Sequence, residues 1–198
     1  MPVSLLVEGE TDEAVARRIC SHLALSVGIA YGKRGKNQLL KKLPSYNMAA
    51  LRMPWFVLVD LDAWEGCTGT FVSATLPLRS PGMRFRVAVR AVEAWLLADK
   101  EQLAEFLRVS PARVPDDPDA LPHPKQTMVN VARHSRYRAI RDDVVPKEGT
   151  GAVVGPLYGA RLREFASTMW RPEEAAARSD SLNRCIRAVA GLGSFEPK

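Results

Sequence analysis

Two short apolar runs in this chain both end in acidic residues. Val3–Val7 (VSLLV) precedes Glu8, and Trp55–Val59 (WFVLV) precedes Asp60 and Asp62. Runs of this length, rich in β-branched and aromatic residues, are typical of strands that are covered on both faces. A sheet with two covered faces needs helices on both sides, so these runs indicate an α/β architecture.

The rest of the first half alternates between strand-like and helix-like segments. Thr11 is a candidate N-cap for the first helix, because its side chain can accept a hydrogen bond from the first turn. The order strand, helix, strand, helix, strand, strand, helix favours a mostly parallel sheet. The predicted elements are a helix over 11–25, a strand over 27–31, short helices near 39–43 and 47–51, a strand over 83–89 and a helix over 90–107.

The second half is predicted to be helical, with helices near 126–134, 158–169 and 181–189. Ser110–Pro124 is rich in proline and reads as a loop, and no element is predicted for Glu65–Gly82. The chain has 198 residues, 46% of them hydrophobic, which is enough for a sizeable core. We therefore expect a core over residues 1–108 and a C-terminal helical extension over 109–198, packed together as one unit.

Basic and acidic residues are distributed unevenly. The formal net charge is +6, and the stretches 14–59 and 66–92 contain bases but no acid, as does the stretch 121–141. The acids that border the first two stretches include Glu8, Asp60, Asp62 and Glu93. A basic surface around a few carboxylates suits a polyanionic partner held near bound cations. A solvated basic surface with no such partner is the alternative interpretation.

The acids at the strand ends form a candidate metal site. Open α/β sheets place their sites at the carboxyl ends of strands, where Glu8 and Asp60 lie. Asp60 and Asp62 are two positions apart, so a continued strand would direct both to the same face. Mg²⁺ prefers oxygen ligands, and two such ions can stabilise the attacking and leaving oxygens in phosphodiester cleavage. Glu93, in the first turn of a predicted helix, is a fourth candidate.

Each of these acids also has a structural interpretation. Glu8 with the following glycine can be a turn, and Asp60 and Asp62 can cap a helix. Glu93 can be a surface residue paired with Arg90. Asp99, six residues further along, lies on a different face of the helix from Glu93 and is taken as structural.

The same segments resemble a known family. LLVEGETDEAVARRI together with FVLVDLD is similar to the TOPRIM domain of topoisomerases, primases and overcoming-lysogenization-defect nucleases. The continuation RAVEAWLLAD resembles small, stand-alone bacterial TOPRIM-like proteins of unassigned function. The resemblance covers about residues 3–108 and implies a TOPRIM-like, Rossmann-like fold. It implies that Glu8, Asp60 and Asp62 hold metal.

The nuclease branch of this family implies two further roles. In that branch an acidic residue from the following helix helps to bind a second metal ion, and Glu93 matches it. The branch also uses a lysine late in the chain, which either Lys147 or Lys125 matches. The chain lacks the tyrosine-bearing domain of a topoisomerase and the P-loop pattern GxxxxGK[ST]. The resemblance implies that ATP is hydrolysed by a separate partner chain, an ATPase, and not by this chain.

A glycine-spaced basic loop and one later lysine are candidate contacts for nucleic acid. Lys33, Arg34 and Lys36 lie on the loop GKRGK, and Lys125 lies in the basic stretch after Leu121. Such residues can contact backbone phosphates. A flexible solvated loop is the alternative for the first three.

These observations predict a Mg²⁺- or Mn²⁺-dependent nuclease that acts on DNA or RNA, as part of phage defence or DNA repair. Glu8 can also serve as general base, and Lys147 or Lys125 as the residue that stabilises charge on phosphate. The rivals are a non-catalytic module that binds nucleic acid or a partner, and a polymerase or primase accessory. Three scattered cysteines and no membrane-length apolar run suggest the cytoplasm, with no leader and no membrane partner. A homodimer is left open.

Overall fold

Four parallel strands form a sheet in the order β2-β1-β3-β4. The computed structural model describes residues 1–62, 64 and 66–197. The strands are β1 (Val3–Val7), β2 (Val27–Gly32), β3 (Trp55–Asp60) and β4 (Met83–Ala88). The predicted α/β class and parallel sheet are therefore confirmed.

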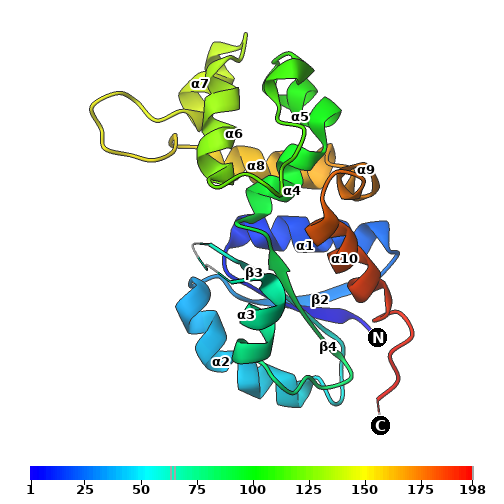
Figure 1. The fold of residues 1–198 in the computed structure, drawn as a ribbon. Coiled ribbons are helices and arrows are strands. Elements are labelled where there is room, and N and C mark those ends of the chain that lie inside the picture. The colour runs from blue at the N-terminus through cyan, green and yellow to red at the C-terminus, as the bar shows by residue number, and fades with distance from the viewer. Residues whose placement is uncertain (63, 65, 198) are drawn as a thin grey trace.

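Helices cover both faces of this sheet. Figure 1 shows α2 and α3 on one face and α1 and α10 on the other, with α4 to α9 stacked beyond α1. The helices are α1 (Glu10–His22), α2 (Lys36–Ala49), α3 (Thr68–Thr75), α4 (Val92–Ala98), α5 (Lys100–Leu107), α6 (Pro124–Arg133), α7 (Arg138–Val144), α8 (Tyr158–Thr168), α9 (Pro172–Ala176) and α10 (Asp180–Ala190), with a short 3₁₀ turn at Pro111–Arg113.

Alternate residues of the central strands enter two different hydrophobic clusters. In β1, Leu5 and Val7 pack with α1, whereas Leu6 packs with Leu39 of α2. Successive side chains of a strand point to opposite faces, so a run that is apolar at every position can fill two cores. This is why the sheet is a middle layer.

The helices after α4 extend the cluster on the α1 side of the sheet. Trp95 of α4, Phe165 of α8 and Trp170 are buried in the same cluster as Val15 of α1 and Phe56 of β3. The α8 helix packs along α1. The C-terminal helices thus share one apolar cluster with the sheet, and the boundary expected near residue 108 stays a prediction.

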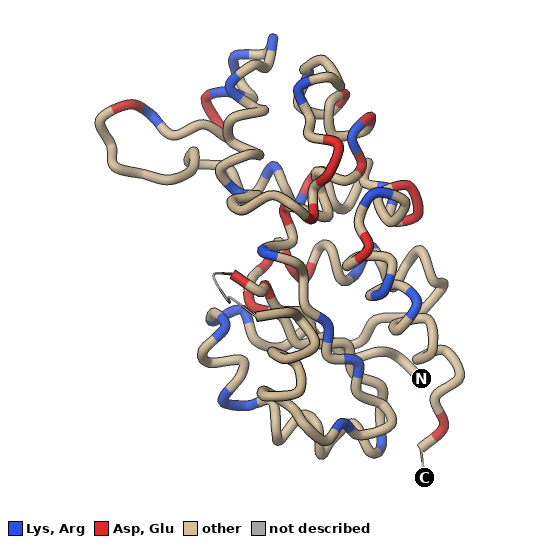
Figure 2. Tube along the Cα trace, in the orientation of Figure 1, with Lys and Arg blue, Asp and Glu red and all other residues tan. Residues whose placement is uncertain are grey.

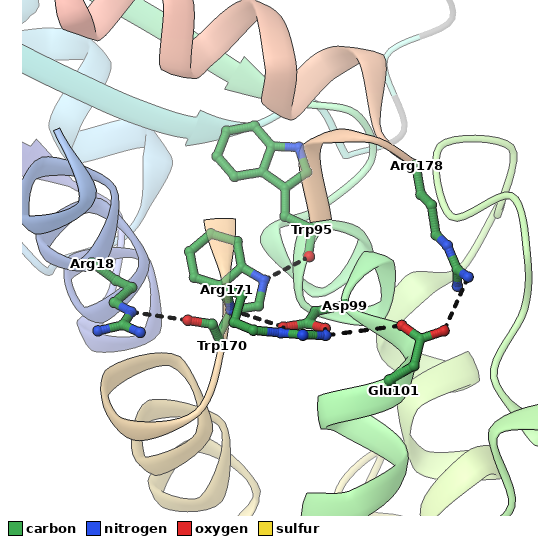
Figure 3. Close-up of polar contacts among 7 residues, drawn as sticks. All are labelled: Arg18, Trp95, Asp99, Glu101, Trp170, Arg171 and Arg178. Carbon is green, nitrogen blue, oxygen red and sulfur yellow. Dashed lines mark hydrogen bonds and ion pairs between the residues drawn. The ribbon is translucent and has the colours of Figure 1, made fainter. Parts of the chain in front are cut away.

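Asp99 anchors the turn between α8 and α9. Its carboxylate is fully buried and accepts hydrogen bonds from the Arg171 backbone amide (2.8 Å), Nε (3.1 Å) and Nη2 (2.6 Å). In Figure 3, Trp170 Nε1 donates to the Trp95 carbonyl, and Arg18 Nε donates to the Trp170 carbonyl. These contacts join α1, α4 and the α8–α9 turn, which agrees with a structural role for Asp99.

Several predicted element boundaries are wrong for local reasons. The α1 helix begins at Glu10 with Gly9 as N-cap, so Thr11 is not the cap. The two short helices expected around Pro44 are one helix, α2, which tolerates the loss of one backbone donor. The helix expected over 90–107 is divided at Asp99 into α4 and α5.

Three helices have no counterpart in the predictions. Within the stretch Glu65–Gly82, Glu65 lies outside the described residues, and α3 (TGTFVSAT) follows, rich in threonine and weak in helix propensity. The α7 and α9 helices are only 7 and 5 residues long. None of the helices in the described ranges is long and apolar enough to cross a membrane.

Candidate active site

The strand order places Glu8 and Asp60 side by side. From β1 the chain passes over one face of the sheet to β2, and from β2 it returns over the other face to β3, next to β1. The gap between the carboxyl ends of β1 and β3 is thus the switch point at which open α/β sheets bind ligands. Glu8 follows β1 and Asp60 ends β3.

Hydrogen bonds to the backbone hold these two acids in place. The Asp60 amide donates to Glu8 Oε1 over 2.9 Å, and the Val92 amide donates to Asp60 Oδ1 over 2.9 Å. The second contact fixes the start of α4 against the end of β3. Glu93, the next residue, is thereby brought to the same end of the sheet.

Asp12 is a fourth acid of this group and was not a predicted site residue. Its side chain is buried, and Oδ2 accepts a hydrogen bond of 2.9 Å from the Gly9 amide. This contact is the return half of a capping box at the start of α1. Oδ1 is also buried and has no hydrogen-bond partner among the described residues. A buried, unpaired carboxylate oxygen is costly unless a ligand completes its contacts.

Glu93 is buried, so the interpretation of a surface residue paired with Arg90 is wrong. Only 4% of Glu93 is exposed, and its Oε1 accepts a hydrogen bond of 3.1 Å from the Tyr158 hydroxyl. Lys125 Nζ lies 3.8 Å from the same oxygen. Arg90 instead donates to the carbonyls of Asp62 and Trp64.

Asp62 lies beyond the end of the strand and is more exposed than Asp60, although both line the same cavity. The strand ends at Asp60, and Asp62 has a left-handed backbone with φ of 55°. The two-residue alternation of a strand therefore does not extend to it. Its side chain is 58% exposed and pairs with Lys36 Nζ at 2.9 Å. Asp62 lies at the rim of the group rather than inside it.

Burial and mutual repulsion raise the pKa values of the inner acids. Burial raises the pKa of Glu8 to about 7, although the Asp60 amide opposes this. Burial, followed by the charge of Glu93, raises the pKa of Asp12 to about 6. The pKa of Asp60 is raised well above its usual value, first by burial and then by Asp12, Glu93 and Glu8. When these acids are ionised, their negative charges are therefore poorly stabilised by the protein alone.

These acids suit a divalent cation, although the side chains do not form a closed ligand cage. Among the described residues, no set of three or more His, Cys, Asp or Glu side chains lies close enough to hold an ion directly. Carboxylate oxygens are the ligands that Mg²⁺ and Mn²⁺ take, and Mg²⁺ keeps several waters when it binds proteins. The free Asp12 oxygen and the repulsion around Asp60 fit such a cation.

A cavity of about 700 Å³ opens beside these acids. Asp60 and Asp62 lie on one side of it, and Arg90 and Lys125 also line it. The α6 helix begins at its edge with Pro124, and the positive end of a helix dipole favours anions. The cavity thus combines carboxylates suited to cations with cationic groups suited to an anionic ligand.

The two candidate lysines have different positions. Lys125 opens α6, lines the cavity and pairs with Glu93. Lys147 is exposed on the loop between α7 and α8, which projects from the helical part in Figure 1. The geometry therefore favours Lys125 as the lysine of this site.

The residues of the predicted phosphate-contact loop are separated in the structure. Lys33 pairs with Glu13 at 2.7 Å, and Arg34 lines a separate cavity of about 430 Å³ at the end of β2. Lys36 is not a free loop residue: it opens α2 and donates to the carbonyls of Asp60 and Leu61. Figure 2 shows basic positions on both sides of the acidic group at this end of the sheet.

Asp12 and Tyr158 are the residues that sequence reasoning missed. Acids are common in the first turn of a helix, where the helix dipole favours them, so Asp12 does not stand out in the sequence. Its position four residues after Glu8, in the first turn of the helix that follows, is the sequence feature that could have indicated a place near Glu8. Tyr158 is 65 residues from Glu93 in the chain, and no local pattern indicates that contact.

Comparison of the chain with protein-family models, with curated proteins and with solved structures finds no match.

Proposed function

We propose that this protein is a divalent-metal-dependent nuclease, or a related phosphodiesterase, that acts on nucleic acid. One observation carries the proposal. Four acids gather at the ends of β1 and β3 and after β4: Asp60 is buried within electrostatic range of Glu8, Asp12 and Glu93, and burial together with their charges raises its pKa well above the usual value. A cavity with basic groups adjoins them.

We also propose that the fold is TOPRIM-like. A parallel sheet in the order β2-β1-β3-β4 supports this, with a glutamate after the first strand and two aspartates from the end of the third. The ATPase partner and the phage-defence or repair role remain predictions, as does the cytoplasmic location, which rests on the scattered cysteines.

In this proposal Glu8, Asp12, Asp60 and Glu93 would hold a hydrated Mg²⁺ or Mn²⁺, partly through its bound waters, with Asp62 at the rim. When bound, such ions lower the pKa of water and neutralise charge on the attacking and leaving oxygens. Glu8 has a pKa of about 7 without metal, and a bound cation would lower it, so near neutral pH Glu8 would be ionised and able to accept a proton from the attacking water. The hydrogen bond from the Asp60 amide holds the Glu8 carboxylate in position for that transfer.

The cationic lining of the cavity supports binding of the scissile phosphate. Lys125 can move between Glu93, 3.8 Å away, and a phosphate oxygen. Arg90 is held by the carbonyls of Asp62 and Trp64, so its charge has a defined position at the cavity wall. Preorganised charges of this kind stabilise negative charge that develops during reaction.

The test is cleavage of labelled DNA and RNA by wild type and by Glu8→Gln and Asp60→Asn in Mg²⁺ and in Mn²⁺. Glu105→Gln, at an exposed position of α5, is the matched control. We expect the site variants to lose about 10²-fold or more in rate and the control to match wild type. Equal cleavage by all three variants, or cleavage by none of the proteins, contradicts the proposal.

One observation favours a second candidate, a non-catalytic module that binds nucleic acid. The acids in the described part of the chain do not form a closed metal cage. The same experiment separates the two, because the module binds nucleic acid with a steep salt dependence but cleaves with neither ion.

A further inference from the structure

A second cavity, of about 350 Å³, lies along the edge of the sheet between α3, β4 and α10. It shares no lining residue with the cavity beside the carboxylates. Two consecutive residues after β4 line different cavities: Val89 lines this one and Arg90 the one beside the carboxylates. Nothing in the proposed chemistry uses this second cavity.

Three arginine side chains line this cavity. Arg79 comes from the loop before β4, Arg86 from β4 and Arg184 from α10. Thr68, Ser73 and Ser181 add hydroxyl groups. The α3 helix begins at Thr68, so the positive end of its dipole also borders the space.

Two of these arginines have no anionic partner in the described part of the chain. Arg184 pairs with Asp180 at 2.8 Å, whereas neither Arg79 nor Arg86 has an ion pair there. Arg86 is partly buried beside the Cys185 thiol, and its Nε is buried with no hydrogen-bond partner among the described residues. Buried polar groups are normally paired, so a guanidinium N–H that lacks an acceptor beside a cavity points to an anionic ligand.

The two carboxylates that line this cavity, Asp119 and Asp180, both have partners within the protein. Asp119 accepts hydrogen bonds from Ser179 Oγ (2.8 Å) and from the Ser181 amide (3.0 Å). Asp180 pairs with Arg184. The neighbouring Arg84 has its pKa lowered by burial and by repulsion from Arg79, which agrees with an excess of positive charge along β4.

We propose that this edge cavity binds a phosphate group, with the guanidinium groups of Arg79 and Arg86 as its main contacts. Arginine offers paired donors that match phosphate oxygens. The volume suits a phosphate with a small attached group. The phosphate is either a diester in a nucleic-acid strand or a free phosphate ester. The anion site itself does not depend on the proposed function. Only the assignment of its ligand to a nucleic-acid strand rests on that function.

The experiment is an NMR titration of metal-free protein, in EDTA at constant chloride, with inorganic phosphate as probe. The amides of Thr68, Gly69 and Ser73 and the Nε–H of Arg86 are followed. We expect these signals to shift and Arg79→Gln, at an exposed position, to weaken binding about tenfold. Arg187→Gln, on the exposed part of α10 and outside the cavity, is the matched control.

A second pair of titrations distinguishes the sources. A 5′-mononucleotide and a single-stranded oligonucleotide of about ten residues are compared in EDTA. Tighter binding of the oligonucleotide assigns the site to a strand, and tighter binding of the mononucleotide assigns it to a free ester. Absence of shifts at the cavity with every probe, or equal weakening by Arg79→Gln and Arg187→Gln, overturns the proposal. Because no metal is present, loss of cleavage in other variants does not affect this result.

Discussion

The backbone amide of Asp60 donates a hydrogen bond to Glu8 Oε1 over 2.9 Å, and this contact joins the ends of two adjacent strands. The donor is a main-chain group, so replacing the Asp60 side chain leaves it in place. The hydrogen bond favours ionised Glu8, yet burial still raises the pKa of that carboxyl to about 7. The charge on Glu8 is therefore sensitive to pH and to cations near neutrality.

The metal-free protein is expected to lose stability as pH rises. The pKa of Glu8 is about 7 in the folded chain against 4.5 ordinarily, and that of Asp12 about 6 against 3.8. The folded state thus binds protons more tightly, so its stabilisation is present below pH 4 and is lost as pH rises to about 7. After allowance for solvent screening, ionisation of Glu8 should lower the free energy of unfolding by about 1–2 kcal/mol over this pH range.

Urea denaturation in EDTA at steps from pH 4 to pH 8 measures this effect. Other ionisable groups add their own slopes, so the informative quantity is the difference between wild type and Glu8→Gln. We expect the variant to gain stability relative to wild type as pH rises, and Glu105→Gln to follow wild type. A parallel pH dependence in all three proteins contradicts the assignment.

Divalent cations are expected to reverse this loss. An ion that binds only the folded state stabilises it by about 2.7 kcal/mol at a concentration of 100 times its Kd. Asp12→Asn removes one charge from the group and should weaken Mn²⁺ binding about tenfold. Calorimetric titration with Mn²⁺ measures this, with Asp142→Asn on exposed α7 as control. Equal Mn²⁺ affinity in the two variants would remove Asp12 from the site.

Lys125 and Lys147 are expected to differ sharply in activity assays. Lys125→Gln removes the cation next to Glu93 and should lower kcat about 10- to 100-fold, with a smaller effect on KM. Lys147 lies on the exposed α7–α8 loop, so Lys147→Gln should stay within about twofold of wild type. Steady-state cleavage of one oligonucleotide by both variants decides between them. A larger loss for Lys147→Gln would show that the loop closes over the site.

The strand ends could be predicted because their signals are local. The apolar runs before Glu8 and Asp60 indicate both strands, and the alternation of strands and helices indicates that they are parallel, whereas the structure adds that they are neighbours. Asp62 shows the limit of this reasoning. One residue with positive φ ends the strand pattern, and a non-glycine residue gives little warning of that conformation.

Contacts made by the C-terminal helices could not be predicted in the same way. Tyr158 reaches Glu93 only because α8 packs against α1, and Lys125 reaches it only because α6 packs against α4. Both depend on how distant helices pack, which periodicity within a segment does not encode. The sequence therefore indicated Glu8, Asp60 and Glu93, but neither Asp12 nor the side chains from distant helices that contact Glu93.

Asp99 is expected to matter for stability and not for chemistry. Its carboxylate is fully buried and accepts three hydrogen bonds from Arg171, which holds the α8–α9 turn against α4 (Figure 3). Asp99→Asn removes the charge that Arg171 faces and should lower the free energy of unfolding by about 2–3 kcal/mol. Glu101→Gln changes an exposed partner of Arg178 and should cost about 0.5 kcal/mol or less. Urea denaturation measures both, and specific activity at a temperature where both are folded should equal wild type. A loss of activity in folded Asp99→Asn would instead connect this network to the site.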